Sequence, residues 1–171
     1  MKHSRRRLLA AMACMLLAAG PVNAGSAKAA EAAPVNWFDS ASVPRLVASQ
    51  QGKPFVLVVW SLDCVYCRRN FEAIGKLQAR NPALRVVTLS MDVPAAQQQV
   101  QQHLQRTRLS RNAWMFGSEM PERLRYALDP DWMGETPRTY FYRADGERRG
   151  VSGVISPADW AAHLRWAGIA G

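Results

Sequence analysis

The feature that most restricts the fold of this chain is an unbroken apolar run at residues 55–60, with the sequence Phe-Val-Leu-Val-Val-Trp. The run is rich in β-branched and aromatic residues, and the turn-forming residues Gly52, Lys53 and Pro54 stand before it. This length and composition are typical of a strand that is buried on both faces. We therefore expect a central strand whose sheet is covered by helices.

Helical and extended patterns alternate along the rest of the chain. Helical spacing and capping residues predict helices over residues 43–50, from 64 past 77, from 92 to about 108, over 121–128 and over 156–166. Extended patterns predict strands over residues 84–91, 113–116, 139–143 and 147–152, with a turn at 144–146. Asp92 with Pro94, and Ser156 with Pro157, are the expected starts of two of these helices. The order β-α-β-α and then β-β-α predicts an α/β fold with a mixed central sheet and helices on both faces.

The N-terminus carries the pattern of an export signal. A basic stretch at residues 2–7 precedes twelve apolar residues, Leu8 to Ala19, and Val22-Asn23-Ala24 offers small residues for cleavage. As a helix the apolar stretch would span about 18 Å, less than the roughly 30 Å of a bilayer core. We expect a signal peptide at 1–24, a flexible lead-in at 25–34 and a single domain at 35–171. Export by the Sec or the twin-arginine route, and anchoring by an uncleaved signal, stay open.

The charge of the chain does not indicate a nucleic-acid partner. The formal net charge is +9, from 22 Lys and Arg against 13 Asp and Glu. Four of the cations, Lys2 and residues 5–7, belong to the expected signal. The remaining arginines are scattered over many segments and form no single basic run. We therefore expect no binding of nucleic acid.

Cysteine usage narrows the chemistry. One of the three cysteines, Cys14, lies in the expected signal, which leaves Cys64 and Cys67 in the mature domain with C-x-x-C spacing. A bridge that closes so short a loop restrains the unfolded chain only weakly, so a purely structural role is a poor explanation. In an oxidising compartment the pair is expected to serve redox chemistry or metal binding.

The position of the pair favours redox chemistry. A helix that opens at Cys64 would present its free N–H groups and positive dipole end to the first sulfur, which favours a thiolate. Cys64 is then the exposed nucleophile, and Cys67 lies one turn below it as the resolving thiol. Arg68 and Arg69 add positive potential, whereas Asp63 opposes it.

Metal binding is the competing interpretation. The other mature ligands of a soft metal, His103 and His163, are sixty residues apart and are expected on helix surfaces. A structural zinc site needs a second local pair, so zinc is not expected. Thiolates do select Cu(I), and a copper-carrying role stays open as an alternative. A dithiol that cycles with a disulfide carries two electrons itself and needs no organic cofactor.

Two motifs in this order resemble the thioredoxin fold in its secreted, TlpA-like form. The first is Gly-Lys-Pro at 52–54, the apolar run and Ser-Leu-Asp-Cys-Val-Tyr-Cys at 61–67, with Trp60 four residues before the first cysteine. The second is Gly-Glu-Thr-Pro-Arg-Thr-Tyr-Phe-Tyr-Arg-Ala-Asp-Gly at 134–146. The resemblance covers about residues 35–168. It implies that Pro137 is a cis-proline facing the dithiol and that the backbone of Thr136 pairs with the substrate.

The resemblance also implies a function. It implies a periplasmic thiol–disulfide oxidoreductase that acts as a dedicated reductase of exported client proteins with cysteines, recharged by a membrane electron donor. We expect a monomer in which Val65, Tyr66 and Trp132 add to the surface that meets the client. Two alternatives stay open: a disulfide donor, and a Cu(I)-binding chaperone of the same fold.

The departures from cytoplasmic thioredoxins predict a narrow range of partners. Val58 stands where those proteins hold a buried aspartate, and Asp63 replaces the tryptophan before the nucleophile. The dipeptide Val65-Tyr66 replaces Gly-Pro. Without the buried carboxylate, proton transfer during resolution needs water or another group.

Overall fold

The structure is a computed structural model that describes residues 34–170. The signal expected at 1–24, and nearly all of the lead-in expected at 25–34, lie outside the described residues. The strands are β1 (Asn36–Phe38), β2 (Phe55–Trp60), β3 (Val86–Ser90), β4 (Ala113–Phe116), β5 (Arg138–Tyr142) and β6 (Arg148–Ser152). The helices are α1 (Ser42–Ala48), α2 (Cys67–Arg80), α3 (Gln97–Arg106), α4 (Pro121–Leu128) and α5 (Pro157–Trp166), with 3₁₀ turns η1 (Pro94–Ala96) and η2 (Ser110–Asn112).

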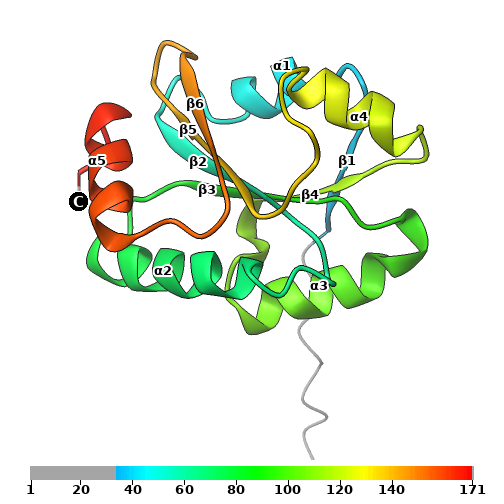
Figure 1. The fold of residues 1–171 in the computed structure, drawn as a ribbon, viewed down its shortest axis with the longest axis horizontal. Helices are drawn as coiled ribbons and strands as arrows, with labels where there is room; N and C mark the ends of the chain where they lie inside the picture. Colours follow the sequence, from blue (N-terminus) through cyan, green and yellow to red (C-terminus); the bar gives the residue numbers. More distant parts are fainter. Residues whose placement is uncertain (1–33, 171) are drawn as a thin grey trace, which may run out of the picture. The chain divides into compact units, whose positions relative to one another are not determined.

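The strands form one mixed sheet in the order β1-β4-β3-β2-β5-β6. The first four strands of this order are parallel to one another, and β5 and β6 are antiparallel to their neighbours. Figure 1 shows α2 and α3 on one face of the sheet and α1 and α4 on the other. The mixed α/β sandwich predicted from the order of the elements is confirmed.

The central strand β2 is buried along its whole length, as its composition predicts. Val56, Val58 and Trp60 face a cluster formed with α2, α3 and α5. Phe55, Leu57 and Val59 face a second cluster formed with α1 and α4. Because successive side chains of a strand point to opposite faces, a strand between two helical layers needs apolar residues at every position.

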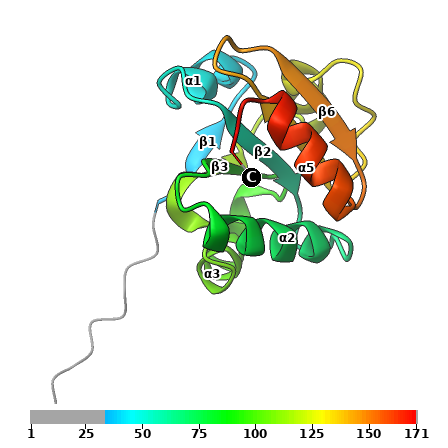
Figure 2. The ribbon, with the colours of Figure 1, turned by 90° about the vertical axis from the view of Figure 1, so that its left-hand side faces the viewer.

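The parallel arrangement gives the sheet two distinct ends. Strands β1, β4, β3 and β2 all start at one end, which we call the far end, and all finish at the other, which we call the dithiol end because Cys64 and Cys67 follow β2 there. The far end faces the viewer in Figure 2, with the C-terminal residues after α5 in front.

Two local expectations were wrong, and one strand was not predicted. Helix α2 begins at Cys67 and not at Cys64, because Cys64 to Tyr66 form a turn before it. Asp92 does not cap the following helix, because its carboxylate hydrogen-bonds to the loop after β2 instead. The short edge strand β1 was not predicted, since three residues are too few to reveal an alternating pattern.

Among residues 34–170, no helix combines the length and the apolar character that crossing a membrane requires.

Candidate functional site

The cysteine pair lies between the end of β2 and the start of α2. Cys64 and Cys67 form a disulfide, with their Cα atoms 5.4 Å apart. The Cys64 N–H donates to the carbonyl of Ser61 at 3.2 Å, and the Cys67 N–H lies 3.1 Å from Cys64 Sγ. The Cys64 sulfur therefore accepts a hydrogen bond from the first amide of α2, although the helix begins three residues later than expected. An amide in this position favours a thiolate when the disulfide is reduced.

The two cysteines differ in burial in the predicted direction. Cys67 is 3% exposed, whereas Cys64 is half-buried and lies toward the surface. Between them, Val65 is 74% exposed and Tyr66 is 59% exposed. A large partner can therefore reach Cys64 first, and it meets two apolar side chains when it does so.

Asp92 fixes the loop that carries Cys64. Its two carboxylate oxygens accept the Leu62 N–H at 3.2 and 3.1 Å, and the Ser90 hydroxyl donates to one of them at 2.6 Å. Asp92 follows β3, so these bonds hold the loop after β2 to the end of the neighbouring strand. The sequence did not predict this role, because an aspartate before a helix can either cap that helix or hydrogen-bond to a neighbouring loop, and the sequence pattern is the same in both cases.

An aromatic cluster lies behind the pair. The Trp60 ring packs against Phe71, with ring centroids 5.2 Å apart, and stacks on His103 at 4.9 Å. Burial, aided by the charge of Arg106 and partly opposed by Asp92, lowers the pKa of His103. His103 was expected on a helix surface, but its ring is half-buried against Trp60 and is held in the neutral form at pH 7.

The second motif lies beside the first. In the antiparallel pairing of β5 with β2, Arg138 stands opposite Val59, which sets Pro137 level with Trp60 at the dithiol end. The Thr136–Pro137 peptide bond is cis. Pro137 is buried and Thr136 is half-buried, and the Pro137 carbonyl accepts the Gly153 N–H at 2.8 Å. Motifs that are seventy residues apart in the sequence thus meet at one end of the sheet.

Thr136 offers free backbone groups at this place. Within the part of the chain that the structure describes, neither its N–H nor its carbonyl has a hydrogen-bond partner. Backbone groups without a partner at the surface can pair with an extended segment of another protein.

Trp132 does not lie on the surface that was expected of it. It is 1% exposed and belongs to the cluster that α1 and α4 cover, and its indole N–H donates to the Glu135 carbonyl at 2.9 Å. Buried in this way, it supports the loop before Pro137 and cannot contact a client. Its neighbour Met133 is 82% exposed and is the apolar side chain that this loop presents.

Asn70 is a buried polar residue that sequence reasoning missed. Its amide N–H donates to the Gly153 carbonyl and its amide oxygen accepts the Ile155 N–H, both at 3.1 Å. These bonds tie the first turn of α2 to the segment between β6 and α5. The sequence feature that could have indicated a buried role is the position of Asn70 on the apolar face of α2, between Cys67 and Phe71.

Residues 34–170 contain no group of three or more His, Cys, Asp or Glu side chains that could hold a metal ion. His163 lies apart from the cysteines, stacked on Phe141 with ring centroids 4.8 Å apart.

Comparison with known proteins places the chain in a family. The sequence model of the thioredoxin-like domain matches residues 46–168. The chain belongs to the thioredoxin-like domain family. With a cysteine pair at disulfide distance at the end of β2, this thioredoxin-like protein is a thiol–disulfide oxidoreductase. No curated protein matches it significantly.

Solved structures share the thioredoxin-like fold. A secreted disulfide oxidoreductase of Mycobacterium tuberculosis is 23% identical, with a TM-score of 0.53 over 70% of this chain and 85% of that one. A thiol:disulfide interchange protein of Chlorobium tepidum is 20% identical, with a TM-score of 0.52 over 70% and 83%. A thio-disulfide isomerase of Thermus thermophilus is 19% identical, with a TM-score of 0.55 over 70% and 82%.

Proposed function

We propose that this oxidoreductase is a periplasmic disulfide reductase that serves a small set of exported client proteins. The observation that carries the proposal is the difference between the half-buried Cys64 and the buried Cys67. A client sulfur can approach Cys64 but not Cys67, so attack and resolution fall to different residues.

The reaction is two successive exchanges. The Cys64 thiolate attacks one sulfur of the client disulfide, the client S–S bond breaks, and the released client sulfur leaves as a thiolate. The Cys67 thiolate then attacks Cys64 Sγ in the mixed disulfide and releases the second client thiolate. Two electrons pass to the client, and the Cys64–Cys67 disulfide is the product that an electron donor must reduce again.

The client docks along the edge formed by Thr136 and Pro137. The free backbone groups of Thr136 pair with an extended client segment, as in the addition of a strand to a sheet. Val65, Tyr66 and Met133 form an exposed apolar rim around the reactive sulfur. A rim of large apolar side chains favours clients that present a matching apolar segment.

The absence of a carboxylate at position 58 supports a narrow range of clients. Val58 is fully buried in the cluster that contains Cys67, so this position supplies no base for the resolving thiol. The Cys67 proton must go to water or to the departing client thiolate, which makes resolution depend on how each client is bound.

The location and the direction follow from the resemblance to secreted, TlpA-like proteins. The sequence pattern at 1–24 indicates export, and the Mycobacterium tuberculosis protein of the same fold is described as secreted. In such a compartment the dithiol stays reduced only if a membrane electron donor recharges it. We propose a monomer without an organic cofactor, because the cysteine pair carries the electrons.

Trapping of mixed disulfides tests the roles of the cysteines. In the Cys67→Ala variant, Cys64 can attack a client but no thiol resolves the mixed disulfide. Covalent adducts that a reductant cleaves should therefore accumulate in the periplasm. The Cys64→Ala variant is the matched control and should give almost none. Equal trapping by the two variants would contradict the assigned roles, and the captured proteins identify the clients.

The equilibrium potential against glutathione tests the direction. A potential near about −250 mV or lower supports the reductase, whereas one near roughly −120 mV would make the protein a disulfide donor. A pair that traps no client but binds Cu(I) tightly would establish the copper chaperone instead.

A further inference from the structure

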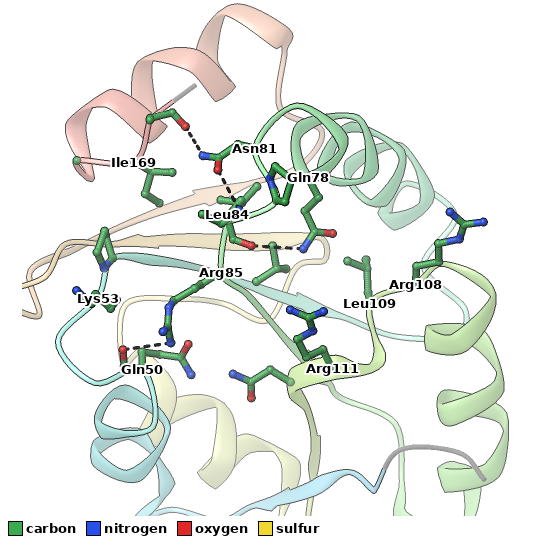
Figure 3. A pocket seen from close by; sticks show the side chains of 17 residues that line it. Gln50, Lys53, Gln78, Asn81, Leu84, Arg85, Arg108, Leu109, Arg111 and Ile169 are labelled. Atoms are coloured by element: carbon green, nitrogen blue, oxygen red, sulfur yellow. Dashed lines mark hydrogen bonds between the residues drawn. The ribbon is translucent and has the colours of Figure 1, made fainter. Parts of the chain in front are cut away.

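A hollow of about 900 Å³ lies at the far end of the sheet, away from the dithiol. Its wall is built from segments that precede three parallel strands, together with the end of α2 and the C-terminal residues after α5. Lys53 lies just before β2, Arg85 just before β3 and Arg111 just before β4, and Arg108 follows α3. Figure 3 shows Arg85 and Arg111 near the middle of the hollow, with Lys53 and Arg108 on opposite sides of it.

Among the described residues, no side-chain carboxylate pairs with the positive charge of the hollow. Its lining holds four cations and no Asp or Glu, and across residues 34–170 none of the four takes part in a salt bridge. Arg85 donates one hydrogen bond, to the Gln50 carbonyl at 3.4 Å, which does not neutralise it. The acidic residues of the β5–β6 hairpin are no counterpart either, because Asp145 and Glu147 pair with Arg143. Clustered cations without carboxylates attract anions.

Arg108 occupies a backbone conformation that favours glycine. Its φ is 60°, and it stands at the C-terminal end of α3, where the Leu109 N–H donates to the Leu104 carbonyl at 2.9 Å. This closing motif most often has glycine at the left-handed position. Helix α5 ends with the same bond pattern at the same hollow and has Gly168 there, with φ 74°. The chain thus keeps an arginine where glycine would be unstrained, and this arginine is the fourth cation of the hollow's lining.

The place where the chain enters the domain identifies the occupant. Strand β1 runs parallel to β4, and the Asn36 side chain donates to the Ala113 carbonyl at 3.2 Å, next to Arg111. Residue 34, where the described part of the chain begins, therefore lies near the far end, and residues 1–33 precede it in the sequence. Their sequence contains the basic and apolar stretches that direct a chain to a membrane. A surface of unpaired cations beside this point of the chain matches the phosphates of anionic lipids.

We propose that the hollow binds the phosphate groups of anionic phospholipids. Lys53, Arg85, Arg108 and Arg111 contact these headgroups. The far end then docks on the bilayer, and the dithiol end points away from it toward exported clients. Docking of this kind does not depend on whether the signal is cleaved.

Sedimentation of the full chain with vesicles tests this proposal at physiological ionic strength. The protein should bind vesicles of phosphatidylglycerol and phosphatidylcholine more tightly than vesicles of phosphatidylcholine alone. The Arg85→Gln/Arg111→Gln variant should weaken the binding to the anionic vesicles about tenfold, because each removed cation contributes to the attraction.

The matched control removes the same charge from the opposite end. Arg45 pairs with Asp39 at 2.8 Å and Arg123 with Glu119 at 3.1 Å, and both carboxylates follow strands that finish at the dithiol end. The Arg45→Gln/Arg123→Gln variant should bind the anionic vesicles like the wild type. All variants keep the same N-terminus, so a difference in vesicle binding between them measures the contribution of the cations in the hollow.

Three results would overturn the proposal. The first is equal binding of anionic vesicles by the wild type and the Arg85→Gln/Arg111→Gln variant. The second is binding of inorganic phosphate in the hollow without binding of anionic vesicles, which would make soluble phosphate compounds the ligands. The third is a preference for a short DNA duplex over the vesicles.

Discussion

Asp129 joins the loop before Pro137 to the two antiparallel strands. Its carboxylate accepts the Tyr140 hydroxyl at 2.8 Å and an Arg138 N–H at 3.0 Å, and Arg148 lies at 3.8 Å. Burial by itself would raise the pKa of Asp129, but these hydrogen bonds and the charge of Arg148 hold it below the ordinary value of 3.8. A carboxylate whose folded pKa is depressed stabilises the native state in its ionised form.

The Asp129→Asn variant should therefore be less stable at neutral pH, by about 2 kcal/mol, because it leaves the half-buried Arg138 charge without its nearest carboxylate. The deficit should shrink as the pH falls below about 4, because the unfolded wild type then binds a proton on Asp129 that the folded protein resists, and it should vanish once the folded carboxylate is protonated as well. Urea unfolding of both proteins between neutral and acidic pH measures this. The exposed Asp145→Asn variant is the control, with almost no change, and a deficit of Asp129→Asn that is independent of pH would contradict the depressed pKa.

Polar residues that bond across segments are the part of the site that the sequence does not reveal. Asp92, Asn70 and Asp129 each bond to groups that lie in other segments. The need for glycine at position 150 also depends on a distant residue, because a Cβ there would meet the Arg138 guanidinium. Such contacts form only when the chain has folded, so the sequence does not show them. The cysteine pair, in contrast, can be recognised from its C-x-x-C spacing.

At the scale of elements, the two helix ends at the hollow offer a matched pair of substitutions. Helices α3 and α5 close with the same bonds, but one has Arg108 and the other Gly168 in the left-handed conformation. A side chain in this region costs about 1 kcal/mol. The Arg108→Gly variant should therefore be more stable than the wild type by about this amount, and Gly168→Ala less stable by a similar amount.

The urea midpoints of the Arg108→Gly and Gly168→Ala variants measure these two changes in stability. A Cβ at Gly168 would meet no atom within 4 Å, so its effect is purely conformational. If Arg108→Gly lowered the stability, the arginine would be contributing contacts to the fold, and its conformation would not need a ligand to explain it.

The elements themselves were largely predictable, and the reason is periodicity. Strand β2 and the helix pattern of α2 come from long, consistent apolar repeats, and the Ser156 hydroxyl does cap α5 by accepting the Asp159 N–H at 3.2 Å. The start of α2 was misplaced because the turn from Cys64 to Tyr66 contains no proline or glycine to separate it from the helix. Strand β1 was missed because its pairing with β4 depends on distant residues.

At the scale of the whole domain, the sheet separates two surfaces of different chemistry. At the dithiol end, the loop after the parallel strand β2 brings the cysteine pair next to the Pro137 segment, which precedes the antiparallel strand β5. The residues that precede the parallel strands bring scattered cations into one hollow. The sequence predicts that the cysteine pair and the Pro137 segment lie together, because both motifs have a recognisable pattern. It does not predict that the cations lie together, because each cation stands alone in its own segment.

The two edges of the sheet differ from its interior in a way that bears on aggregation. Strand β1 has only three residues, and β6 carries Arg148 and Arg149, with Arg149 lying 4.1 Å over the Trp166 ring. Short or positively charged edge strands are poor templates for the edges of neighbouring copies. The domain can thus keep an uncovered sheet edge on each side and still resist aggregation while many copies fold close together.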